Sequence, residues 1–109
     1  MDQQEISIHE AASRLTQQGG TFVELFRHGS LSVEYYKPVG VDLQQPHDRD
    51  EIYVIASGTG TFFHAGRRIP FQQGDFLFVP AGAVHRFEAF STDFATWVFF
   101  YGPLGGERV

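Results

Sequence analysis

Four side chains between Gln45 and His85 have the types and the spacing to bind one metal ion. Gln45, His47 and Glu51 lie close together in the sequence, whereas His85 follows only after several strand-like segments. Imidazole and carboxylate groups bind divalent iron, manganese, nickel and zinc in proteins, and an amide oxygen is a weaker, neutral donor. We therefore predict a divalent-metal site made of all four residues, which forms only if the chain folds back on itself.

The spacing of His47 and Glu51 would place both on one face of a helix, but their neighbours favour a strand. Pro46 lacks an amide donor, and the run Ile-Tyr-Val-Ile after Glu51 is β-branched and aromatic. On one straight strand the two residues would be roughly 13 Å apart, too far for metal bonds of about 2 Å. We therefore expect a bend between them, after which Glu51 shares a strand face with Tyr53 and Ile55.

The segment before Gly58 resembles the first signature motif of the cupin superfamily. That motif reads glycine, five residues, His-x-His, three or four residues, Glu, six residues and Gly. Glu51 and His47 stand at the matching distances from Gly58, while Gln45 replaces the first His and Gly40 is one residue too close. The pattern Gln-x-His is similar to that of type I phosphomannose isomerases, which are also cupins.

The segment from Gly74 onward resembles the second cupin motif, which reads glycine, five residues, Pro-x-Gly, two residues, His, three residues and Asn. Gly74, Pro80, Gly82 and His85 match it, and Ala89 replaces the Asn. The resemblance implies an all-β, cupin-type jelly-roll β-barrel with a divalent metal of unspecified identity. It also implies a homodimer that takes a small-molecule ligand or substrate, and it leaves the reaction open because one fold hosts many chemistries.

Composition excludes several classes of function. With 13 acidic and 8 basic side chains the formal net charge is -5, which repels nucleic acid and anionic lipid, so we expect neither as a partner. The absence of cysteine excludes disulfides, thiolate ligands and cysteine nucleophiles. The N-terminus lacks the basic and apolar regions of a signal peptide, and no apolar run reaches the ~20 residues that span a bilayer. We expect a soluble, cytoplasmic protein.

The remaining pattern predicts one small β domain after a short helix. Residues 1–20 form an N-terminal extension with a helix at 8–18, which Ser7 and Glu10 cap and Gly19 ends. Residues 21–102 form the barrel, and the glycine-rich residues 103–109 form a flexible C-terminal tail. The predicted strands are 21–27, 31–37, 51–56, 61–64, 68–71, 76–79, 85–90 and 94–101.

Each candidate side chain also has a simpler interpretation. A single histidine in a turn is usually a surface group, Glu51 could be solvated at a strand start, and Gln45 could bond only to backbone. Tyr53 and His64 are weak candidates for proton transfer, and His64 could equally be exposed at the rim. By parity, Tyr53, Phe87, Trp97 and Phe99 are candidates for the pocket wall, with Glu34, Tyr36 and Arg68 as polar members.

Four hypotheses about function follow. The first is a metal-dependent, dioxygenase-like enzyme acting on a small molecule, and the second is a metal-dependent isomerase or lyase at the same site. The third is a metal-containing barrel that binds a sugar or another metabolite without turnover. The fourth is a metal-free structural barrel. Both faces of the strand around Val98–Phe100 are apolar, which a monomer satisfies poorly, and this supports a dimer.

Overall fold

The structure is a computed structural model that describes residues 4–109. Within this range the chain forms one helix and eight strands, which confirms the predicted all-β class with a short N-terminal helix. Each predicted strand is present, with ends that differ by at most two residues. The elements are α1 (Ile8–Gln18), β1 (Phe22–His28), β2 (Leu31–Tyr36), β3 (Asp50–Ser57), β4 (Thr59–His64), β5 (Arg67–Gln72), β6 (Phe76–Val79), β7 (His85–Glu88) and β8 (Ala95–Tyr101).

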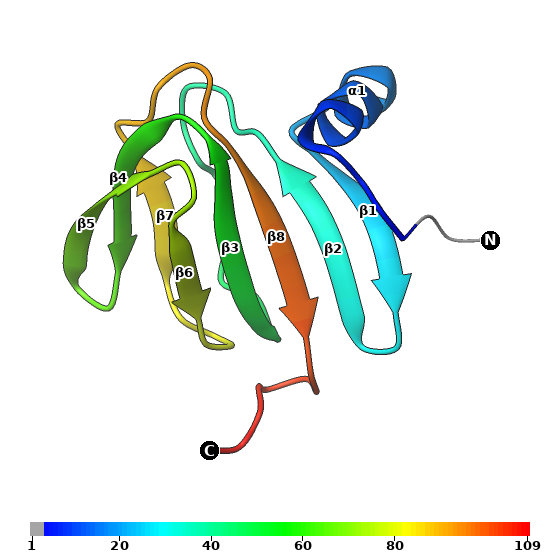
Figure 1. The fold of residues 1–109 in the computed structure, drawn as a ribbon. Helices are drawn as coiled ribbons and strands as arrows, with labels where there is room; N and C mark the ends of the chain where they lie inside the picture. Colours follow the sequence, from blue (N-terminus) through cyan, green and yellow to red (C-terminus); the bar gives the residue numbers. More distant parts are fainter. Residues whose placement is uncertain (1–3) are drawn as a thin grey trace.

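The strands form two antiparallel sheets (Figure 1). The larger sheet has the order β1-β2-β8-β3-β6, and the smaller has the order β5-β4-β7. The main core draws on both sheets and consists of Tyr53, Ile55, Phe62, Phe71, Val79, Phe87, Phe94 and Val98. Aromatic rings dominate this core, and each buries about 150–250 Å², which explains how so short a chain fills the space between two sheets.

Helix α1 packs against the outer face of the larger sheet, as its apolar stripe predicts. The Ser7 hydroxyl accepts a hydrogen bond of 3.0 Å from the Glu10 amide, and Gly19 ends the helix with a φ of 84°. Ala11 and Leu15 are buried in a second apolar cluster with residues of β1 and β2. Ile8, the first residue of the stripe, stays 45% exposed, so the contact is confined to the middle of the helix.

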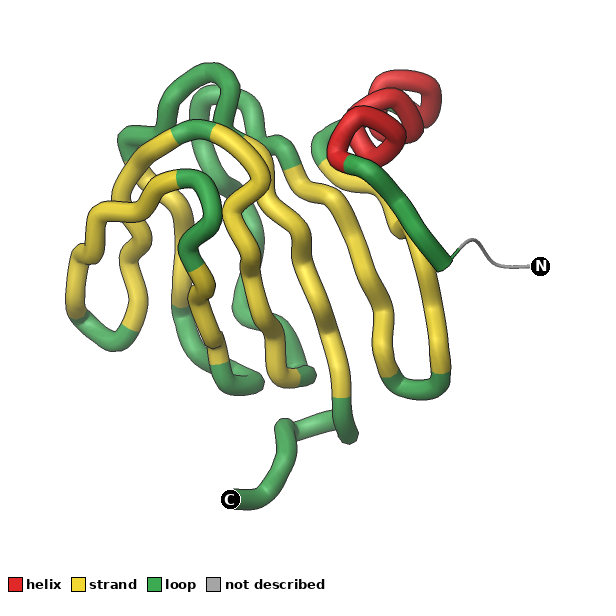
Figure 2. Tube along the Cα trace, in the orientation of Figure 1, coloured by secondary structure: helices red, strands yellow, loops and turns green. Residues whose placement is uncertain are grey.

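The long loop between β2 and β3 passes behind β3 in the view of Figure 2 and is fixed by the buried residue Asp42. Its carboxylate accepts hydrogen bonds from the Tyr36 hydroxyl (2.5 Å), the Gln44 side-chain amide (2.6 Å) and the Phe87 backbone amide (2.9 Å). A buried carboxylate is tolerated only with such partners. Because Phe87 belongs to β7, Asp42 holds the loop of the larger sheet against a strand of the smaller one.

Residues 103–109, which we predicted to be a flexible tail, contact the chain just before β3. The Gly105 amide donates to the Asp48 carbonyl at 2.7 Å, and the Glu107 amide donates to Asp50 Oδ2 at 2.8 Å. Asp50 is buried and also accepts from the Ala81 amide at 3.0 Å. The C-terminal segment therefore helps to fix the start of β3.

A pair of glycine substitutions tests how tightly the β3–β4 corner is packed. Gly58 has a φ of 85°, and an added Cβ would lie 2.6 Å from the Phe94 Cα and the Ser91 Oγ. Gly29 also has a positive φ, but nothing lies within 4 Å of its added Cβ. We expect Gly29→Ala to cost about 1–2 kcal/mol of unfolding free energy from backbone strain, and Gly58→Ala about 1–3 kcal/mol more from the clash. Urea denaturation measures both, and equal losses would contradict the packing at this corner.

Candidate metal centre

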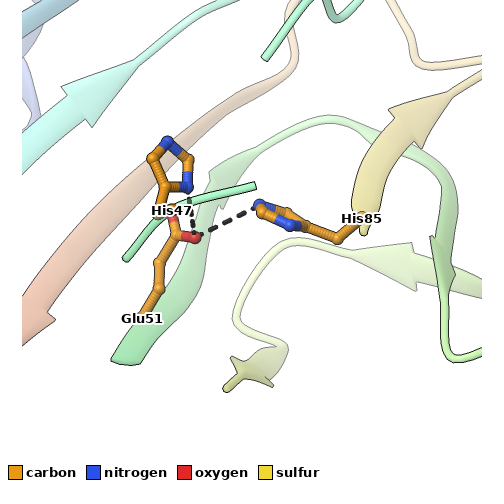
Figure 3. Close-up of side chains that lie close together, drawn as sticks. All are labelled: His47, Glu51 and His85. Atoms are coloured by element: carbon orange, nitrogen blue, oxygen red, sulfur yellow. Dashed lines mark hydrogen bonds and ion pairs between the residues drawn. The ribbon is translucent and has the colours of Figure 1, made fainter. Parts of the chain in front are cut away.

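Three of the four predicted ligands meet between the two sheets (Figure 3). His47 comes from the loop before β3, Glu51 from β3 itself, and His85 from the start of β7. Glu51 Oε1 lies 3.1 Å from His47 Nδ1 and 3.2 Å from His85 Nε2. One donor atom from each residue lies within 4.8 Å of the others, a spacing that could hold a metal ion.

The hydrogen bonds around His85 prepare one of its ring nitrogens to be a ligand. Nδ1 lies 3.0 Å from the Ala83 carbonyl oxygen, which can only accept, so Nδ1 carries a proton. In the neutral ring this leaves the lone pair on Nε2, the atom that faces Glu51. A histidine ligand fixed through its second nitrogen in this way is typical of metal sites. Two imidazoles and one carboxylate therefore fit a divalent metal of the iron, manganese, nickel or zinc type.

Glu51 and His85 are only 1% and 3% exposed, so their charges must compensate one another. Burial raises the pKa of the Glu51 carboxyl, but hydrogen bonds with His47 and His85 outweigh this and keep its pKa below the ordinary value. Burial lowers the pKa of His85, but the hydrogen bonds with Glu51 and the Ala83 carbonyl leave it raised. A divalent cation would take over the role of the imidazole protons, so its binding would release protons.

The predicted bend between His47 and Glu51 is present and is fixed by backbone hydrogen bonds. The Gly82 amide donates to the His47 carbonyl at 2.7 Å, which joins the two motif segments directly. Arg49 Nε donates to the Gly102 carbonyl at 3.2 Å on the other side of the bend. The ligand loop is therefore held from both the β6–β7 connection and the C-terminal segment.

Gln45, the fourth predicted ligand, is exposed, and its neighbour Gln44 faces the site instead. Gln44 Oε1 accepts a hydrogen bond of 3.0 Å from the Tyr53 hydroxyl, and its Nε2 donates to Asp42. Motif spacing pointed to position 45, whereas the alternation of Asp42 and Gln44 in an extended segment could have indicated 44. Ligation by Gln45 stays a prediction.

The two weak catalytic candidates occupy different places. Tyr53 is fully buried, with its hydroxyl 3.0 Å from His85 Nε2, and burial together with the Glu51 charge raises its pKa well above the ordinary value. The hydroxyl therefore keeps its proton and donates a hydrogen bond to Gln44. His64 pairs with His85 across β4 and β7 and is partly buried, and burial followed by the nearby His85 charge lowers its pKa.

A cavity of about 500 Å³ opens beside His47 and Glu51. Glu34 and Tyr36 line it, as predicted for polar members of the wall, together with Val98 and Phe100 of β8. The prediction of Trp97 and Phe99 as wall residues is wrong, because both lie on the opposite face of β8 beside Val54. Because both faces of β8 are apolar, its sequence does not indicate which residues face inward. Pairing with β2 and β3 decides this.

The fold and the site together define a small two-sheet barrel with a His-Glu-His cluster that could hold a metal ion, the arrangement expected of cupins. The sequence profile of the cupin domain matches residues 32–101, so the chain belongs to the cupin family. It is 31% identical over 86 residues to the uncharacterized protein SCO3923 of Streptomyces coelicolor, covering 77% of this chain and 82% of that protein.

Solved structures show the same fold. Protein NMB1881 of Neisseria meningitidis has a TM-score of 0.69 at 17% identity, covering 91% of this chain and 100% of that one. A predicted oxalate decarboxylase of Thermotoga maritima has a TM-score of 0.59 at 23% identity, covering 73% and 77%. Among the helices of residues 4–109, none has the length and apolar character needed to cross a membrane.

Replacing one buried ligand tests the metal centre. We expect His85→Ala to lower the metal content of protein purified without added metal from about one ion per chain to almost none, because a carboxylate and one half-exposed imidazole hold a cation poorly. Elemental analysis by mass spectrometry measures it. His28→Ala is the matched control, since His28 is exposed on β1 and should leave the content unchanged. Equal metal content in all three proteins would rule out this centre.

Proposed function

We propose that this cupin is a metal-dependent enzyme that oxidises a small molecule with O₂, with divalent iron held by His47, Glu51 and His85. The observation that carries the proposal is the cavity beside His47 and Glu51. Three protein donors on one side leave open coordination positions for a divalent metal, as in catalytic sites, whereas structural sites are closed by protein ligands. When bound, such an ion acts as a Lewis acid and can bring substrate and O₂ together.

The protein side chains supply position, charge and protection from water. His85 and Glu51 are buried and held by their hydrogen bonds, so their geometry is set before a ligand enters. His47, whose side chain is 32% exposed, lies at the opening and borders the cavity. The Tyr53 hydroxyl donates its hydrogen bond to Gln44 and lies 3.0 Å from His85 Nε2, so it helps to hold this ring in place.

Isomerase or lyase chemistry is the alternative at the same centre. Two further groups that can carry protons support it: Tyr53 at the buried side and Glu34 in the cavity wall. The predicted oxalate decarboxylase of Thermotoga maritima has the same fold. In this reaction the substrate would lose or move a proton without consuming O₂, which distinguishes it from oxygenation.

Oxygen consumption separates the hypotheses. We expect anaerobically purified protein loaded with Fe(II) to consume O₂ with a member of a panel of small diketones, thiols and flavonols, as measured with an oxygen electrode. Zinc-loaded protein and Fe(II)-treated His85→Ala should give at most the rate of free Fe(II), because one cannot change oxidation state and the other lacks a ligand. Turnover of a panel compound by zinc-loaded protein without O₂ uptake would instead support the isomerase or lyase alternative.

We also propose that the protein is a homodimer formed by the outer face of the larger sheet. Two rows of apolar side chains cross β6, β3 and β8 on this face without a charge. These rows are Phe78–Ile52–Phe99 and Phe76–Val54–Trp97. Phe76 and Phe78 are 63% and 42% exposed, since α1 packs mainly on β1 and β2 and reaches the rows only at Trp97.

The area and the lack of charge favour a second copy of the chain as the partner. Phe76 and Phe78 are exposed and the other four side chains of the rows are partly exposed, so a second copy that covers the rows would remove a continuous apolar patch from water. In a dimer with a two-fold axis, the same patch of both copies meets. Because the patch carries no charge, two chains of net charge -5 can approach each other there.

Charge on this face should separate the copies. We expect Phe78→Glu to convert the dimer to a monomer at micromolar concentration, because two carboxylates would be buried without partners. Sedimentation velocity measures the mass. Leu104→Glu is the control, since Leu104 is 74% exposed and lies outside the rows. A wild-type protein that sediments as a monomer at tens of micromolar would contradict the dimer and leave the face to another partner.

A further inference from the structure

The cavity beside the metal centre has an apolar wall with acidic groups. Its apolar lining residues are Phe22, Pro38, Val39, Val41, Leu43, Val98 and Phe100. The polar groups in the described lining are Thr21, Glu34, Tyr36, Gln44, His47 and Glu51, and none of these lining residues is a lysine or an arginine. A ligand that fills the cavity therefore meets apolar surface along its body and carboxylates at its polar ends.

Glu34 is the polar group of the wall that lies away from the metal ligands. It pairs with Val98, which pairs with Tyr53 on the next strand, so all three share the inner face of the sheet. Two strand spacings place the Glu34 backbone roughly 10 Å from that of Tyr53. Glu34 is half-buried, and no hydrogen bond of its carboxyl to another described residue occurs. Burial, followed by the charges of Glu24 and Glu51, raises the pKa of Glu34, and these effects outweigh the opposite influence of His47 and Arg27.

The basic side chains near the cavity are engaged elsewhere. Arg27 forms a hydrogen-bonded ion pair with Glu24 at 2.6 Å. Lys37 donates to the carbonyl oxygens of Thr92 (2.9 Å) and Phe94 (3.3 Å). Neither residue lines the cavity. An anionic group at the Glu34 end of a ligand would therefore meet a carboxyl group, while the nearby Arg27 is already paired with Glu24.

We propose that Glu34 determines specificity and selects a small ligand with an apolar body, one end on the metal and a hydrogen-bond donor or cation at the other end. The carboxyl of Glu34 accepts the hydrogen bond from that far end, and it disfavours phosphate esters and dicarboxylates. This inference rests on the proposed metal centre at His47, Glu51 and His85. It adds that the lining of the cavity, and not only the metal, determines which ligands bind.

Three catechols of the same shape test the inference, because each presents one metal-binding head and differs at the far end. Dopamine carries an ammonium group, 4-ethylcatechol is neutral, and 3,4-dihydroxyphenylacetate carries a carboxylate. Zinc-loaded protein, which cannot oxidise them, is titrated with each by isothermal calorimetry. We expect dopamine to bind about tenfold or more tightly than 3,4-dihydroxyphenylacetate, the gain of one charge-assisted hydrogen bond.

Glu34→Gln should bring the three affinities to within about a factor of three, since the amide keeps the shape and removes the charge. Glu5→Gln is the control: Glu5 is exposed before α1, does not line the cavity, and should leave the wild-type order intact. Equal affinity of the cationic and anionic catechols for the wild-type protein would overturn the inference. So would binding of none of the three, or a preference that survives Glu34→Gln.

Failure of the metal centre would look different. In that case zinc would bind wild type and His85→Ala equally, which direct zinc titration shows before any catechol is added. If zinc binding requires His85 and the catechol preference is absent, the proposed function stands and the role of Glu34 is wrong.

Discussion

The carboxylate of Glu51 is buried between two imidazoles, one from the loop before β3 and one from β7 of the smaller sheet, and much of the structure serves to keep them there. A charged group that is 1% exposed needs partners of opposite charge, and His47 and His85 supply them at 3.1 and 3.2 Å. Because β3 and β7 belong to separate sheets, this cluster also joins the two halves of the barrel. The arrangement that could hold a cation is therefore also a structural contact, and loss of any partner would leave a buried charge uncompensated.

A second buried carboxylate, Asp42, performs the corresponding task for the loop that precedes the site. It accepts hydrogen bonds from Tyr36, from Gln44 and from the backbone of Phe87, and so fixes an irregular segment against regular strands. Gln44 in turn accepts a hydrogen bond from the Tyr53 hydroxyl, which lies beside His85. The side chains of Tyr36, Asp42, Gln44 and Tyr53 thus form a connected network, and such networks rigidify a protein interior.

The two faces of the larger sheet have separate tasks. Its inner face carries Glu51 of the His-Glu-His cluster, much of the aromatic core and the cavity with Glu34. Its outer face is covered by α1 at one end and presents uncharged apolar rows at the other. Strand β8 takes part in both, since Val98 and Phe100 face the cavity while Trp97 and Phe99 face outward. A single strand therefore links the ligand pocket to the surface through which we propose that two copies associate.

The sequence alone determined the fold class, the positions of the helix and strands, and the three residues of the His-Glu-His cluster. Glycine and proline punctuation, β-branched runs and motif spacing are local signals, and each of these features is local or lies within a motif. The tertiary structure alone decided which of Gln44 and Gln45 faces the site, which face of β8 lines the cavity, and that Asp42 anchors the loop. These outcomes depend on the register between strands and on the path of an irregular loop. The sequence of a strand that is apolar on both faces does not show which face is buried until its neighbours pair with it.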